Sequence, residues 1–105
     1  MSLLLVAIVQ DSDADRVVDA LGEAGHRSTR LPSLGGYLGA ANTTILVGID
    51  DAQEDEVLAI LERTCSGREV EVPLVLLERL KDAPRVVQYG GATVFVVELR
   101  RIVRL

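Results

Sequence analysis

Four kinds of side chain that suit a phosphate-bearing nucleotide occur close together in the first half of the sequence. Arg27 and Thr29 belong to the stretch HRSTRL, and LPSLGGYLGAANTT, residues 31–44, follows directly with Tyr37 and Asn42. Arginine offers a delocalised cation with several donors, threonine a hydroxyl, asparagine an amide that can read a base edge, and tyrosine a flat face. The pattern predicts a nucleotide-binding surface. The alternative is that these are exposed surface side chains that bind no ligand.

The glycines of residues 31–44 are more numerous than a plain turn requires. Gly35, Gly36 and Gly39 stand beside Tyr37 and Asn42, and each glycine permits positive φ or a close backbone approach at an entropic cost. No Gly-Lys-Ser/Thr follows, as a Walker loop requires, and the glycine spacing differs from that of a dinucleotide fingerprint. The stretch therefore predicts either a backbone shaped around a ligand or a long hairpin connection.

Three aspartates at alternate positions, Asp11, Asp13 and Asp15, begin like a calcium loop. The sixth position is Arg16 instead of the turn glycine, and the twelfth is Gly22 instead of a bidentate glutamate. We therefore expect no metal site here. The acidic side chains instead suit the start of a helix, where the helix dipole favours negative charge.

His26 and Cys65 are the only histidine and the only cysteine. His26 has no second metal-ligating residue or orienting acid at a readable spacing, and Cys65 falls on the apolar stripe of an expected helix, where a buried thiol is typical. No general base stands beside the glycine-rich stretch. We expect no catalytic residue, no metal and no cofactor, and therefore no enzyme.

Composition limits the classes of protein to which the chain can belong. Its 105 residues and 11.3 kDa suit one domain, and an aromatic content of 3% predicts an aliphatic core. The net charge of −5 and a pI near 4.7 oppose non-specific binding of nucleic acid. The apolar run near the N-terminus lacks the features of a signal peptide, and no run is long enough to span a membrane. We expect a soluble, cytoplasmic protein.

An internal repeat predicts the elements that position these side chains. Residues 5–21 resemble residues 45–61 when the sequence is moved by 40 positions, and each copy reads as an aliphatic strand, an acidic turn and an amphipathic helix. HRSTRL follows the first copy as a strand, and QYGGATVFVVEL, residues 88–99, follows the second. The pattern predicts an α+β, ferredoxin-like βαββαβ domain with an antiparallel sheet and two helices on one face. The aliphatic face without helices suggests a homo-oligomer.

Several motifs of the chain, in order, resemble the PII-like cyclic di-AMP receptor proteins of bacteria. They are AIVQDSD, RSTRLPSLGGYLGAANTTILVGIDD, ERTCSGRE and YGGATVFVV, and the resemblance as a whole runs over residues 1–69 and 88–105. The resemblance implies a single PII-like domain over residues 1–105. It also implies a homotrimer that binds cyclic di-AMP, its ligand, in clefts between subunits and relays the signal to a downstream protein by rearranging loops.

The resemblance also implies which residues bind the dinucleotide. Arg27 and Thr29 would face phosphates and ribose, and the glycine-rich loop, residues 33–42, would wrap the nucleotide. The expected ligand-binding residues are Arg27, Thr29, Gly35, Gly36, Tyr37, Leu38, Asn42, Gly48, Gly91, Ala92 and Phe95.

The sequence departs from this family at Gly25, where an amide is frequent, at His26, where an aromatic is frequent, and at Tyr37, where phenylalanine is usual. The largest departure is residues 68–87, a variable loop or an inserted short element, where apolar residues replace a flexible Gly-, Ser- and Pro-containing segment. An alternative function is therefore a PII-like trimeric module that binds another adenine nucleotide or only a protein partner. An enzyme acting on a phosphorylated small molecule is the third alternative.

Overall fold

The computed structural model describes residues 1–31, 42–65, 85–89 and 91–105, which form two successive strand–helix–strand units. The first unit is β1 (Ser2–Gln10), α1 (Asp11–Glu23) and β2 (Ser28–Leu31). The second is β3 (Asn42–Asp50), the short 3-10 helix η2 (Asp51–Gln53), α2 (Glu54–Thr64) and β5 (Ala92–Leu99), with β4 (Arg85–Tyr89) preceding β5. The repeat found in the sequence therefore corresponds to two copies of one structural unit.

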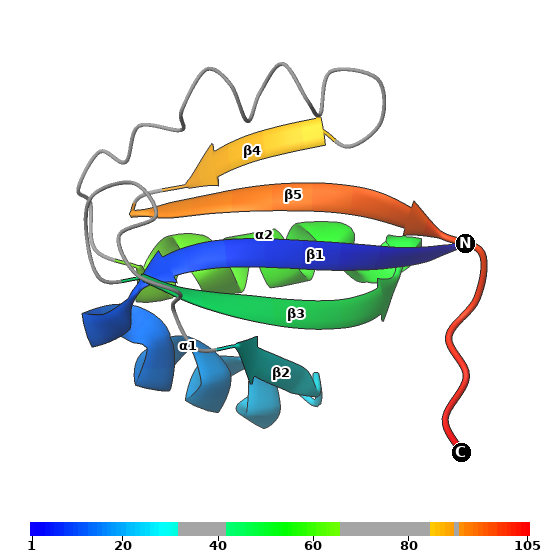
Figure 1. Cartoon of the computed structure of the whole chain (residues 1–105), viewed down its shortest axis with the longest axis horizontal. Helices are drawn as coiled ribbons and strands as arrows, with labels where there is room; N and C mark the ends of the chain where they lie inside the picture. The colour runs from blue at the N-terminus through cyan, green and yellow to red at the C-terminus, as the bar shows by residue number, and fades with distance from the viewer. Residues whose placement is uncertain (32–41, 66–84, 90) are drawn as a thin grey trace.

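The strands form one sheet in the order β2-β3-β1-β5-β4, and every neighbouring pair is antiparallel (Figure 1). The four strands β2, β3, β1 and β5 with the two helices are compatible with a ferredoxin-like fold, so the α+β prediction is confirmed. β4 extends this sheet at the edge beside β5.

Alternation along the strands divides the sheet into two faces. In β1 the odd-numbered residues from Leu3 to Val9 are buried, whereas Leu4 and Val6 are only half-buried. The register places Leu4 opposite Gly48 and Val6 opposite Leu46, so these residues share one face. We call this face, which lies opposite the helices, the open face. Its members in the described strands include Thr29, Asn42, Leu46, Gly48, Phe95, Val97 and Leu99, from the pairing register.

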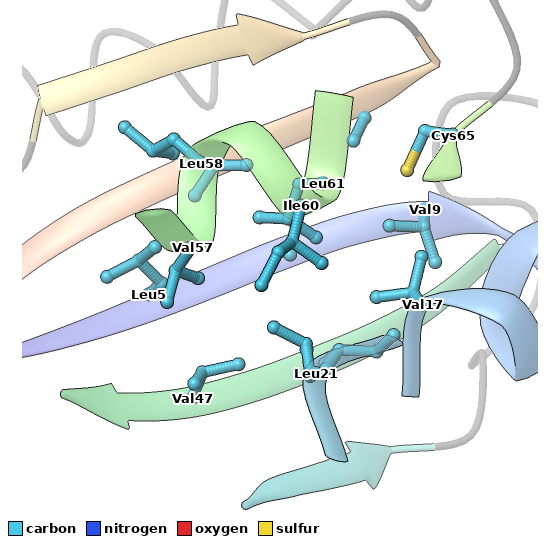
Figure 2. Close-up of a cluster of buried hydrophobic side chains, with 14 of the residues drawn as sticks. Leu5, Val9, Val17, Leu21, Val47, Val57, Leu58, Ile60, Leu61 and Cys65 are labelled. Carbon is cyan, nitrogen blue, oxygen red and sulfur yellow. The ribbon is translucent and has the colours of Figure 1, made fainter. Parts of the chain in front are cut away.

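The core lies between the other face of the sheet and the two helices (Figure 2). Val17 and Leu21 of α1 and Val57 and Leu61 of α2 are completely buried against the sheet. Each such side chain contributes about 1.5 to 3 kcal/mol relative to an exposed one. The core is aliphatic, as the composition predicts, and it places both helices over one face of the sheet.

The last strand differs from the sequence prediction, which extended it over residues 88–99 with a glycine pair inside. The structure instead has an antiparallel pair, β4 and β5, with Tyr89 opposite Ala92 and Gly91 in the turn between them. The prediction of one strand is wrong because glycine followed by an apolar run fits a turn as well as a strand interior. Residues 85–87 of the segment 68–87 belong to β4, and residues 68–84 lie outside the described residues.

Candidate functional site

Arg27 and Thr29 reach the edge of the sheet through a tight connection between α1 and β2. Gly25 adopts φ 88°, a left-handed conformation that glycine accepts without strain, and the His26 backbone N–H donates to the Leu21 carbonyl at 2.8 Å. This helix ending turns the chain directly into β2. Gly25 therefore suits the left-handed position that this turn contains.

The His26 ring holds this connection against α2. The ring is buried, and its Nε2 lies 2.9 Å from a carboxylate oxygen of Glu56. The sequence did not reveal this acidic partner, because Glu56 lies 30 positions from His26. Since Arg27 follows His26 directly, this contact limits where the arginine can lie.

Arg27, Thr29 and Gly48 line one pocket of about 760 Å³. Its walls come from both sides of the edge strand β2: Val18 and Gly22 belong to α1, whereas Thr29 and Gly48 lie on the open face. Three of the residues that the sequence predicts to bind a nucleotide therefore share a pocket within one chain. A second pocket of about 450 Å³ adjoins it and shares Arg27 and Gly48.

The C-terminal segment, residues 100–105, lines the same pocket, and the sequence interpretation did not include it. Arg101, Ile102 and Arg104 are among the lining residues, and a Cβ added to Gly48 would meet the Ile102 side chain at 3.0 Å. The sequence signal was the run RRIVRL after the last strand. That run reveals a cationic cluster but not the element against which it packs.

Asn42 lies at the opposite end of the sheet from this pocket. It pairs with Gln10 at one end of β3, whereas Gly48 pairs with Leu4 towards the other end. At about 3.3 Å per residue, the six steps between them separate the two positions by about 20 Å. Asn42 is buried at 5% exposure. Within the described residues, Asn42 is therefore not brought together with Arg27 and Gly48.

Gly91, Ala92 and Phe95 occupy different positions on the last strand. Gly91 is buried in the turn before β5, and Phe95 lies mid-strand on the open face, opposite Val6. The Ala92 methyl belongs to the core cluster. Only the backbone of Ala92 could therefore contact a ligand on the open face. Gly35, Gly36, Tyr37 and Leu38 lie outside the described residues.

Thr93, which the sequence interpretation did not single out, is a further polar residue of this region. Its side chain is fully buried, and its Oγ1 has no hydrogen-bond partner within the described part of the chain. The register places it opposite Ile8 and on the open face. A buried hydroxyl without a partner is costly in the free chain, so Thr93 is a candidate donor to a bound or neighbouring molecule.

The three aspartates of the calcium-loop-like pattern, at the start of α1, each have a partner that is not a metal. Thr43 Oγ1 donates to Asp11 at 2.5 Å, Arg16 pairs with Asp13, and Arg30 pairs with Asp15 at 2.8 Å. Among the described residues no group of three or more His, Cys, Asp or Glu side chains is arranged to hold a metal ion. Asp11 and Asp15 thus link α1 to β3 and β2, whereas Asp13 pairs within α1.

Cys65 is not an activated nucleophile. Burial, followed in effect by the nearby Asp13 carboxylate, raises the pKa of the Cys65 thiol to about 11. Since the thiolate is the reactive form, the thiol is inert at neutral pH. The buried, structural thiol expected from the sequence agrees with this position in the core.

The described helices are too short or too polar to cross a membrane. A solved structure of a functionally unknown protein from Pediococcus pentosaceus is similar to this chain, with 31% sequence identity and a TM-score of 0.72. The similarity covers 99% of this chain and 97% of the other. The family model described as "Cyclic-di-AMP receptor" matches residues 1–105. From this match over its full length, the chain belongs to the cyclic-di-AMP receptor family.

Proposed function

We propose that this protein is a cytoplasmic signalling protein that binds cyclic di-AMP in clefts between the subunits of a homotrimer and relays the signal by loop rearrangement. Family membership supports the ligand class. The observation that carries the rest is the separation of the expected site residues. Gly48 shares the open face with Asn42 but lies towards the other end of β3, and Thr29 lies opposite Leu46, between the two.

A cleft between two copies reconciles this separation with a single binding site. In a closed ring, one end of each subunit meets the opposite end of its neighbour. Arg27, Thr29 and Gly48 of one subunit would then face Asn42 of the next. The apolar side chains of the open face, including Val6 and Leu46, would supply buried area for such contacts.

Calorimetric titration with cyclic di-AMP, ATP and cyclic di-GMP in parallel tests the ligand. We expect binding of cyclic di-AMP in preference to the other two nucleotides. Arg27→Ala should weaken that binding and flatten its dependence on salt, because it removes an exposed phosphate-facing cation. Arg30→Ala is the matched control, since Arg30 pairs with Asp15 on the other side of β2 and should leave the affinity unchanged.

Mixing two defective variants tests the cleft between subunits. Arg27→Ala and Asn42→Asp would each weaken binding at every site when alone, so the titration is run at a cyclic di-AMP concentration at which neither variant binds. If the two residues come from neighbouring subunits, refolding an equal mixture should restore roughly a quarter of the sites. No recovery in a verified mixed trimer would place both residues in a site within one subunit and would contradict the proposed cleft.

The same titrations distinguish the alternative function, a trimeric module that binds another adenine nucleotide or only a protein partner. Preference for ATP, or binding of none of the three nucleotides, would favour it. The departure of residues 68–87 from the family pattern is the feature that motivates this alternative.

A further inference from the structure

The C-terminal segment, residues 100–105, leaves the end of β5 and runs past the ends of β3 and β2 (Figure 1). Its residues are exposed, but Ile102, at 41% exposure, lies over Gly48 on the open face. Because position 48 has no side chain, Ile102 can approach the strand closely. This contact anchors the middle of the segment beside the pocket.

Arginines on either side of this anchor bring an unusual charge to the pocket. The chain has a net charge of −5, yet Arg101 and Arg104 join Arg27 among the lining residues. No Asp or Glu among the described residues lines this pocket or the adjoining one. Glu56 contacts His26, which lines both pockets, but Glu56 is not itself a lining residue. Three cations in one pocket repel one another, so the arrangement favours a ligand with more than one negative charge.

We propose that Arg101 and Arg104 are phosphate-binding residues that act with Arg27 in this pocket. The inference rests on the proposed function and deepens it, because a cyclic dinucleotide carries two phosphates and Arg27 alone can neutralise only one. A guanidinium presents a planar fork of donors that matches phosphate oxygens. The C-terminal segment is thus part of the binding site.

Titration of cyclic di-AMP into the Arg101→Ala/Arg104→Ala double variant of the full chain tests this inference. We expect the dissociation constant to rise about 10- to 100-fold, the range for loss of hydrogen bonds to a charged group. The salt dependence of binding should also become shallower. Thermal stability should stay equal or rise slightly, because like charges are removed.

Two further variants separate a binding role from a structural one. Arg100→Ala is the matched control, because Arg100 is exposed on the same segment and lines neither pocket; it should bind as the wild type does. Arg101→Lys/Arg104→Lys keeps the charges and should recover much of the affinity. Light scattering on every variant checks that the assembly is unchanged.

Three outcomes would overturn the inference. Wild-type affinity and salt dependence in the double alanine variant would show that these arginines do not contact the ligand. Tighter binding would show instead that the segment competes with the ligand for the pocket. Failure of the wild-type protein to bind cyclic di-AMP would remove the proposed function and this inference together, and the wild-type titration alone identifies that case.

Discussion

At the scale of single residues, Asn42 links the proposed recognition of a nucleotide to the stability of the fold. It begins β3 and is buried, so Asn42→Asp would place a carboxylate where little water reaches it. If its amide also reads an adenine, the change replaces a donor by an acceptor beside an anionic ligand. We expect binding of cyclic di-AMP to weaken by about 2 to 4 kcal/mol.

Asn42→Ala distinguishes these two effects, because it removes the amide without adding a charge. Thermal melts of both variants should show a greater loss of stability for the aspartate. Titration should show weakened binding for both. Wild-type affinity in both folded variants would end the role of Asn42 in nucleotide recognition.

Cys65 provides a prediction that does not depend on any ligand. With a pKa raised to about 11 from 9.0 by burial, the folded thiol should react with Ellman's reagent at pH 7.5 far more slowly than the denatured chain. As the pH rises from 9.0 to about 11, the Cys65 thiol loses its proton in the unfolded chain before it does so in the folded protein. The contribution of Cys65 to stability therefore falls as the pH rises through this range. Equal reaction rates in folded and denatured protein would show that the thiol is accessible.

At the scale of elements, Arg16 joins the start of α1 to the end of α2. It pairs with the buried Asp13 and donates to the Thr64 carbonyl at 3.2 and 3.3 Å. Arg16→Ala removes the cation from Asp13 and a partner from the last turn of α2. Since Arg16 itself is exposed, we expect a loss of about 1 to 2 kcal/mol in the free energy of unfolding.

Urea denaturation measures this effect, with Arg63→Ala as the matched control. Arg63 is an exposed arginine next to Thr64, so its removal should change stability by no more than about 0.5 kcal/mol. Equal stabilities for the two variants would mean that the contact between the helices contributes nothing measurable.

At the scale of the whole molecule, the open face predicts assembly. Light scattering of the wild type should give a mass near three times 11.3 kDa. Val6 lies mid-strand on this face, so Val6→Lys should place a charge in the interface and lower the mass. Asp19→Lys, on an exposed position of α1, is the control and should leave the trimer intact.

Circular dichroism on the same samples separates loss of assembly from loss of fold. A folded Val6→Lys monomer would agree with the prediction. A wild-type monomer at micromolar concentration would remove the basis for a cleft between subunits.

Local pattern in the sequence was sufficient for the two strand–helix repeats and the aliphatic core. These features depend on contacts between residues close in sequence and on the periodicities of helix and strand, both of which are visible in the amino-acid sequence. The residue types that suit a nucleotide were also visible. The chemical type of a side chain is read directly from the sequence, so no structure is needed to identify it.

Tertiary structure alone decided which of those residues share a pocket. Strand register places Gly48 beside Arg27 but leaves Asn42 at the far end of β3, and it turns the Ala92 methyl into the core. It also brings Arg101 and Arg104 from the C-terminus to Arg27, more than 70 positions earlier in the chain. Pairing between distant strands sets these positions, because a shift of one residue would exchange the two faces of a strand.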